Sequence, residues 1–282
     1  MLLSGENTPF DESIKALSDW LQKIEEEIKE SNDKNIANLR RTMLKVGRKM
    51  LMLAEQAREK WLKTYRQELE ELIESLRSGR AKVIISGDPF NEDRSFVVHL
   101  YTENLTINVA RVAKSGSITI EMAFTGLRGG THIAVPKLFD ENKLRAMQYG
   151  LLLTDGSIHK RGGYPVMGTN QLWQAIAWLL AWPGRNHMYV DGVGINGNDV
   201  GIAWKLMAID HKDEVRSKAE VAGEVGKLSS DDFVIFLLFA VLGDGDVDVE
   251  EKFVRLHMGE SKRELWGQHN REVEEPRVQG EG

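Results

Sequence analysis

The sequence predicts an α+β protein, because the period of its apolar residues changes twice along the chain. Residues 11–78 carry apolar side chains at helical spacing. Residues 81–135 instead alternate between apolar and polar side chains, as half-buried strands do. From Glu141 onward, apolar helical runs and short β-branched runs follow one another. We therefore expect four segments: a helical hairpin over 1–80, a small antiparallel β module over 81–139, an αββαββα unit over 140–228, and an incomplete second copy of that unit over 229–282.

Two helices are expected in residues 11–78. The apolar residues of the first recur at steps of three and four and form one stripe: Ile14, Leu17, Leu21, Ile24 and Ile28. Ser31-Asn32-Asp33 ends this helix and caps the second, which keeps a heptad spacing from Ile36 to Ala57. The spacing predicts a coiled-coil hairpin that ends at Ser78-Gly79 and offers a surface for a homo-oligomer through residues 11–78.

The heptad of the second helix is interrupted after Ala57. The apolar step becomes four at Trp61 and again at Tyr65 and Leu69. A stutter of this kind locally unwinds a supercoil. We expect the coiled coil to be locally unwound at this point.

Five basic residues gather on the second helix: Arg40, Arg41, Lys45, Arg48 and Lys49. The preferred interpretation is a solvated helix face balanced by nearby glutamates. Contact with phosphates is the alternative.

The segment 81–139 contains five short runs of strand type: KVIIS, SFVVHLY, LTINVARV, SITIEMAF and THIAV. Turn residues such as Asp88-Pro89 and Ser115-Gly116 separate them. The pattern predicts an antiparallel sheet of about five strands. The segment carries no motif with a known chemistry.

Residues 140–228 predict the order helix, strand, strand, helix, strand, strand, helix. Asp140 is a good cap for the first helix, and Pro183-Gly184 ends the apolar helix NQLWQAIAWLLAW. Two long strands form a hairpin across Asn196-Gly197, and a helix is expected from about Lys212 to Leu228. Ser229 then caps a second apolar helix, where the order restarts.

The composition of the chain excludes several kinds of site and of protein. The 282 residues contain no cysteine, which excludes a disulfide framework, a thiolate zinc site and a cysteine nucleophile. The longest purely apolar run, Phe233 to Leu242, is half of the roughly 20 residues that a membrane span needs. We expect a cytoplasmic protein with no membrane segment. The net charge of −6 argues against broad electrostatic adhesion to nucleic acid.

The stretch FLLFAVLGDGDVDVEEKF (236–253) raises the question of a calcium loop. Asp244, Asp246 and Asp248 occupy the first, third and fifth places of an EF-hand. Val249 stands where the turn needs glycine, and Arg255 stands where the bidentate glutamate is required. The calcium interpretation is therefore rejected.

An earlier stretch has the same plan as this one. QYGLLLTDG (148–156) and LLFAVLGDG (237–245) are both apolar helices that end in Asp-Gly, with Asp155 and Asp244 lying 89 positions apart. If the two helices packed side by side, their terminal carboxylates would meet. Paired carboxylates suit hard divalent cations such as Mg²⁺, which can activate water in phosphodiester cleavage.

These two strings resemble the signature helices of the LAGLIDADG homing endonucleases, over the chain from about Glu141 onward. In that family the two helices form the interface between pseudo-symmetric halves, their terminal acids hold the metals, and four-stranded sheets saddle the DNA. The resemblance implies that Asp155 and Asp244 are metal ligands and catalytic residues, and that double-stranded DNA is the partner. Gly150, Gly156 and Gly245 match the motif glycines.

Other basic residues follow from the same resemblance. Lys205, on a predicted strand, would polarise a scissile phosphate or water, the alternative being an exposed strand lysine. His159, Lys160 and Arg161 follow the first motif, on the strand that would approach DNA, and would contact phosphate or form a charged turn.

The chain also departs from the family pattern. Phe239 stands where the second copy should have its inner glycine, and Leu153 and Leu242 replace the helix-capping Asp of the signature. Only 37 residues follow Gly245, so the second half is expected to be incomplete and cleavage activity weak or lost.

The arrangement is also similar to the paREP repeat-protein families of hyperthermophilic archaea, which multiply in genomes and contain shortened members. The resulting hypothesis is a degenerate or inactive relative of a metal-dependent LAGLIDADG DNA endonuclease from a mobile element. The alternative is a non-catalytic DNA-binding or oligomeric assembly protein organised by the coiled coil.

Overall fold

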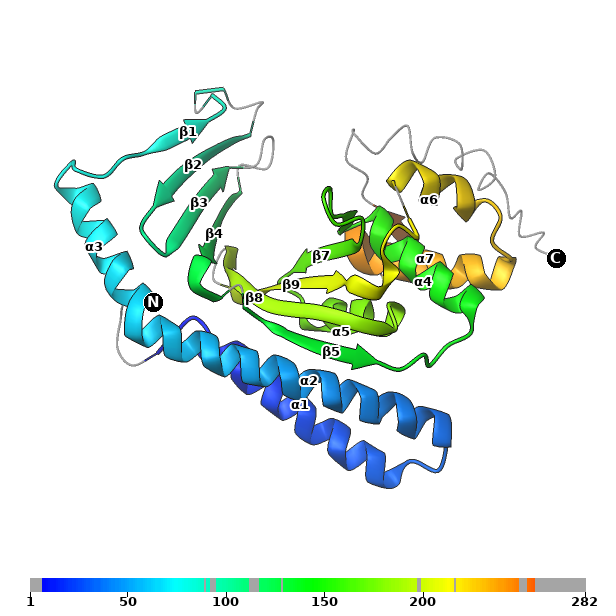
Figure 1. Ribbon diagram of the computed structural model, residues 1–282. Coiled ribbons are helices and arrows are strands. Elements are labelled where there is room, and N and C mark those ends of the chain that lie inside the picture. Colours follow the sequence, from blue (N-terminus) through cyan, green and yellow to red (C-terminus); the bar gives the residue numbers. More distant parts are fainter. Residues whose placement is uncertain are drawn as a thin grey trace, which may run out of the picture.

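The computed structural model describes residues 7–256 except 89, 92–94, 112–116, 128, 197–198, 216 and 249–252 (Figure 1). It has the α+β composition that the sequence predicts, with an N-terminal helical region followed by strands. No helix within the described residues combines the length and the apolar composition that crossing a membrane would take.

The chain begins with the expected helical hairpin. Its elements are α1 (Asp11–Glu30), α2 (Lys34–Lys60), the short helix η1 (Trp61–Tyr65) and α3 (Arg66–Arg77). Asp33 caps α2, because its carboxylate accepts hydrogen bonds from the backbone N–H groups of Asn35 and Ile36.

The apolar stripe of α2 is used inside the chain. Val46, Met50 and Ala57 are fully buried in the same core as residues of the sheet. Ile36, at the start of the heptad, is 45% exposed. The surface expected to join copies of the chain is therefore largely covered by the chain itself.

The stutter in the heptad is a π-helical turn, η1. Four residues advance by about 40° more than one α-helical turn, so repeated steps of four would rotate the apolar side chains away from the core. The wider π turn absorbs this drift. Trp61 and Tyr65 consequently stay fully buried, and the Tyr65 ring stacks on Phe124 at a centroid distance of 4.5 Å.

Nine strands form one antiparallel sheet in the order β1-β2-β3-β4-β8-β9-β7-β6, with β5 pairing to β8. Their bounds are β1 (Ile84–Ser86), β2 (Phe96–Tyr101), β3 (Leu105–Arg111), β4 (Ile118–Phe124), β5 (Thr131–Val135), β6 (Gly156–Ile158), β7 (Pro165–Thr169), β8 (Gly184–Asn196) and β9 (Asp199–Ala208). β8 joins the two parts, because one half of this long strand pairs with β5 and the other with β4. The strands of segment 81–139 therefore do not form a sheet of their own.

Helices cover one face of this sheet. α5 (Leu172–Ala181) packs on β7 and β9, while α2 contacts α5, β5 and β8 (Figure 1). On β9 the side chains that face these helices are buried: Ile202, Trp204, Leu206 and Ala208. The alternate side chains Ala203, Lys205 and Met207 lie on the other face and are only half-buried. We call this other side the open face of the sheet.

α3 is fixed to the turn between β2 and β3 by one carboxylate. Glu68 accepts hydrogen bonds from the Thr102 hydroxyl (2.5 Å), the Asn104 backbone N–H (3.0 Å) and the Asn104 side-chain amide (2.5 Å). Burial alone would raise the pKa of Glu68, but these donors outweigh it and lower the pKa below 4.5. The bonds hold the β2–β3 turn against α3.

The remaining elements are α4 (Glu141–Leu153), the 3₁₀ turns η2 (Thr125–Leu127) and η3 (Ile209–His211), α6 (Lys218–Val225), α7 (Ser230–Asp244) and the paired strands β10 (Gly245–Asp248) and β11 (Phe253–Leu256). The order from α4 to α6 follows the predicted helix and strand order. α6 begins later than expected because Ser217, whose side chain accepts from the Glu220 N–H, caps it. The acidic stretch after α7 enters an antiparallel strand pair, and residues 249–252 between those strands lie outside the described part.

Candidate metal and nucleic-acid site

α4 and α7 pack side by side, and Gly150 is where their backbones approach each other (Figure 1). A Cβ atom added at Gly150 would lie 2.7 Å from the carbonyl oxygen of Phe236 and 2.9 Å from the backbone nitrogen of Ala240. It would also lie 2.7 Å from the Cβ atom of Phe239. The close contact therefore depends on a glycine in α4 that meets the backbone of α7 next to Phe239.

The two Asp-Gly ends lie at the same end of this helix pair. A Cβ atom added at Gly243 would come within 2.3 Å of the Thr154 hydroxyl oxygen, so the residues that directly precede Asp244 and Asp155 are in contact. Asp244 is the last residue of α7, but its side chain lies outside the described part. The backbone geometry thus brings together the two positions that the sequence pairs.

Both motif glycines let the chain fold back over its own helix. A Cβ atom at Gly156 would lie 2.8 Å from the carbonyl oxygen of Leu151, and one at Gly245 would lie 2.4 Å from that of Val241. Any other residue would clash with backbone that cannot move cheaply. α4 ends at Leu153, two residues before Asp155, whereas α7 runs through Asp244, so the expected helix end at Asp-Gly holds for α7 only. In both cases the glycine is the first residue of a strand, β6 or β10.

Asp155 is exposed, and an amide orients its carboxylate. The side-chain N–H of Gln174 donates to Asp155 Oδ2, and the Gln174 oxygen accepts from the Thr169 hydroxyl. Gln174 itself is 3% exposed, so its position is fixed by the packing of α5. A carboxylate held by an outer hydrogen bond is typical of metal ligands.

An exposed carboxylate such as that of Asp155 could hold a hard cation that keeps most of its water. The described residues contain no group of three or more His, Cys, Asp or Glu side chains placed to hold one ion. Mg²⁺ often takes one or two carboxylates and completes its octahedron with water. Asp155 and Asp244 would be the protein ligands, and a bound Mg²⁺ would supply positive charge next to a phosphate.

Lys205 lies on the open face of the sheet and makes no contact with Asp155 that the structure records. It is opposite Gly168 of β7 and Tyr189 of β8. A Cβ atom at Gly168 would lie 3.6 Å from the Lys205 Nζ, so the ammonium group extends over this bare position. Lys205 is therefore placed to meet a ligand on the open face.

His159, Lys160 and Arg161 form the turn between β6 and β7. His159 closes it, because its Nδ1 accepts from the Gly162 N–H at 2.9 Å and its ring stacks on Tyr164 at 4.9 Å. His159 therefore stabilises the turn. The side chains of Lys160 and Arg161 are exposed to solvent.

The open face also contains a hollow of about 320 Å³ that the sequence did not indicate. Its polar lining residues are Asn108, Glu121, Thr169, Asn170 and Asp191. Beside Met122, Val193 and Trp204, its other lining residues are strand residues with little or no side chain: Ala123, Gly168, Gly192, Gly194 and Ala203. Glycines inside strand patterns were the available signal, since they often mark close approach by a ligand. Thr169 links the hollow to Asp155 through Gln174.

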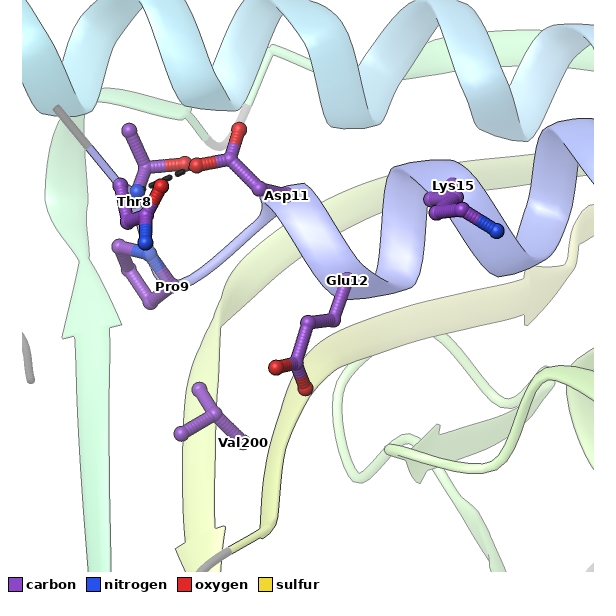
Figure 2. A pocket seen from close by; sticks show the side chains of 7 residues that line it. Thr8, Pro9, Asp11, Glu12, Lys15 and Val200 are labelled. Carbon is purple, nitrogen blue, oxygen red and sulfur yellow. Dashed lines mark hydrogen bonds between the residues drawn. The ribbon is translucent and has the colours of Figure 1, made fainter.

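A second hollow, of about 260 Å³, lies beside the start of α1 (Figure 2). Asp11 is engaged there by Thr8 and by Arg58, whose Nε donates at 2.6 Å. Burial acts to raise the pKa of Asp11, but the bonds from Arg58 and Thr8 prevail and lower the pKa. These groups serve to fix the start of α1, and no predicted site residue lies among them.

His187 makes stability depend on pH. Its ring lies 4.7 Å from that of His132 on the neighbouring strand, and burial, aided by the charge of His132, lowers the pKa of His187 below 6.5. The unfolded chain therefore binds this proton more readily than the folded one. The free energy of unfolding is expected to fall as the pH drops from about 6.5 through the lower folded pKa.

Urea titrations at several pH values measure this dependence. The variant His187→Phe is expected to flatten the slope between pH 6.5 and 5, while His99→Gln, at a histidine that is hydrogen-bonded to Asn108 and Ser86, should leave it in place. An unchanged slope in His187→Phe would contradict the assignment.

Comparison of the chain with models of protein families, with curated proteins and with solved structures found no match. The functional argument therefore depends on the geometry of these residues.

Proposed function

We propose that this chain is a double-stranded-DNA-binding protein related to the LAGLIDADG endonucleases, with Asp155 and Asp244 as ligands of Mg²⁺. The observation that carries the proposal is the α4–α7 pair. Gly150 brings the helices together, and the contact between Thr154 and Gly243 sets the two Asp-Gly ends side by side.

The sheet supports the same proposal. β6, β7, β9 and β8 form four adjacent antiparallel strands that follow α4 in the chain. The open face of the sheet carries amide and carboxylate groups, including Asn108, Asn170 and Asp191, around its hollow. Such groups can read base edges in a major groove, because amides pair with adenine and carboxylates accept from cytosine. Lys205, Lys160 and Arg161 would contribute contacts to phosphate.

Binding is the proposed activity, with little or no cleavage. Only one of the two inner glycines is present, since Phe239 faces Gly150 across the helix contact. The approach of the helices is therefore one-sided, whereas a two-metal reaction depends on a closely defined spacing of the carboxylates. An origin in a mobile or repetitive element, as in the paREP families, belongs to the same proposal.

The alternative of an assembly protein has less support. The apolar stripe of α2, including Val46 and Met50, is buried within the chain and leaves little of the coiled-coil surface for a second copy. Oligomerisation through residues 11–78 is therefore not proposed as the main function.

A duplex selection followed by binding measurements tests the proposal. Rounds of selection from a randomised duplex library with Mg²⁺ should enrich a common sequence, and Asp155→Asn should weaken binding to it about tenfold in Mg²⁺ but not in EDTA. Asp19→Asn, at an exposed aspartate of α1, serves as the matched control. Supercoiled plasmid should show little nicking.

The proposed metal site can be tested without measuring DNA binding or cleavage. Fe²⁺ with ascorbate and peroxide should cleave the polypeptide close to residues 155 and 245, and Asp155→Asn should abolish that cleavage. Failure to enrich any duplex, together with no local cleavage by Fe²⁺, would refute the proposal.

A further inference from the structure

The solvent side of α2 carries a groove that the proposed function does not use. It is lined by six residues of one helix face, which we call the α2 groove: Arg41, Leu44, Lys45, Arg48, Lys49 and Met52. Its volume is about 410 Å³. Four of the six residues are cations, and Leu44 and Met52 form an apolar floor.

The groove is open because the other faces of α2 are occupied. Val46, Met50 and Leu53 point into the core, and Gly47 lies against Leu21 and Trp20 of α1. The groove residues recur at steps of three, one and three, which keeps them on the remaining face. Part of the basic cluster in the sequence therefore lines the groove, and part of it contacts α1.

Within the described residues, three of the four groove cations are not paired with an acid. Between Lys34 and Ala54 the sequence has six basic residues and no acidic one. Arg40 and Arg48 do pair with α1, through Glu27 at 3.0 Å and Glu25 at 2.5 Å. In the part of the chain that the structure describes, no carboxylate forms an ion pair with the other three groove cations: Arg41, Lys45 and Lys49.

The spacing of these cations fits a phosphate backbone. Arg41, Lys45 and Lys49 follow one another at steps of four, so they span about 12 Å along the helix axis. One strand of B-DNA places a phosphate about every 3.4 Å along its axis, so several phosphates would face the three cations. Leu44 and Met52 are only half-buried and no aromatic side chain lines the groove, which is unlike the broad apolar face of a helix that lies in a membrane.

We propose that the α2 groove is a second binding surface for the phosphate backbone of double-stranded DNA. The choice of DNA as the polyanion rests on the proposed function. α2 packs on the helix-covered side of the sheet, whereas the proposed base-reading surface is the open face (Figure 1). One duplex on each side means that a single chain bridges two DNA segments.

Salt dependence tests the groove in the full chain. The triple variant Arg41→Gln, Lys45→Gln, Lys49→Gln removes three phosphate contacts, and the slope of log K against log salt should fall by about 2 to 3. The charge-matched control is Lys23→Gln, Lys29→Gln, Lys63→Gln, which neutralises exposed lysines outside the groove. The control should keep the slope within about 0.5 of the original. Equal slopes for the triple variant and the wild type would overturn the proposal.

A capture experiment separates this inference from the proposed function. Wild-type protein on bead-bound duplex should retain a second, labelled duplex, and the triple variant should bind the beads but lose at least tenfold of the retained label. If the triple variant still retains the label, the groove proposal fails and the proposed function stands. If the wild-type protein does not bind the beads, both fail. Binding of the wild type to phosphatidylglycerol vesicles, lost in the triple variant while duplex retention persists, would refute DNA as the occupant.

Discussion

Gly150→Val is expected to destabilise the protein by about 3 kcal/mol, because the valine side chain has no room between α4 and α7. The added Cβ atom would meet the Phe236 carbonyl oxygen at 2.7 Å and the Ala240 nitrogen at 2.9 Å, and both atoms are backbone. Relief requires the two helices to move apart. The Asp-Gly ends would separate with them, so the Fe²⁺-dependent cleavage near residues 155 and 245 should also be lost.

Gly223 of α6 provides the matched control for this substitution. It is also a helical glycine, but nothing lies within 4 Å of an added Cβ atom. Valine has a somewhat better helix propensity than glycine, so Gly223→Val should change stability by only a few tenths of a kcal/mol. Urea unfolding of the two variants makes the comparison. Equal free energies of unfolding would show that the contact at Gly150 does not hold the helices together.

Trp61→Ala is expected to lower the free energy of unfolding by about 4 kcal/mol, because it removes a fully buried indole ring. Trp61 is 0% exposed and lies in the π turn between α2 and α3. Its ring lies 6.0 Å from Phe124 and 6.4 Å from Phe10. Alanine would leave a cavity where three aromatic rings meet, and the rigid helix and sheet on either side cannot close it.

Two variants distinguish burial of the ring from disturbance of the π turn. Leu62→Ala alters the next residue of η1, which is 43% exposed, and should cost less than about 1 kcal/mol. Trp61→Phe keeps an aromatic ring and should cost about half as much as alanine. Thermal unfolding followed by near-ultraviolet circular dichroism reports both. If Leu62→Ala lowers the stability as much as Trp61→Ala does, the effect comes from the backbone of the turn and not from burial of the ring.

Local patterns predicted most elements because their causes are local. The apolar period of α1 and α2, the Asp33 and Asp140 caps and the Asp-Gly ends of α4 and α7 depend on residues within a few positions of one another. The stutter after Ala57 predicted a local unwinding of the coiled coil, and the π turn at this point is a finding of the structure. Heptad spacing says nothing about the identity of the partner, however. The spacing therefore predicted that the apolar stripe of α2 joins copies of the chain, whereas residues of the same chain cover most of it.

The sequence pointed to the two carboxylates of the candidate site but not to the residues that surround them. Asp155 and Asp244 follow from two similar strings, and Gly150 from its place in one of them. Gln174, which orients Asp155, is a single polar residue in an apolar helix and matches no motif. The hollow on the open face unites Asn108 of β3 with Asn170 and Asp191, which only strand pairing brings together.

The sequence by itself determined the α+β class, the order of helices and strands from α4 to α6, and the existence of two apolar helices that lead to an Asp-Gly pair, because hydrophobic period and capping act over a few residues. Only the tertiary structure decided that β8 joins the two groups of strands into one sheet, that Gly150 closes the contact between α4 and α7, and that the α2 groove remains open. Those outcomes depend on which surfaces, distant in the sequence, pack together and exclude water. The free energy of that packing depends on the whole core.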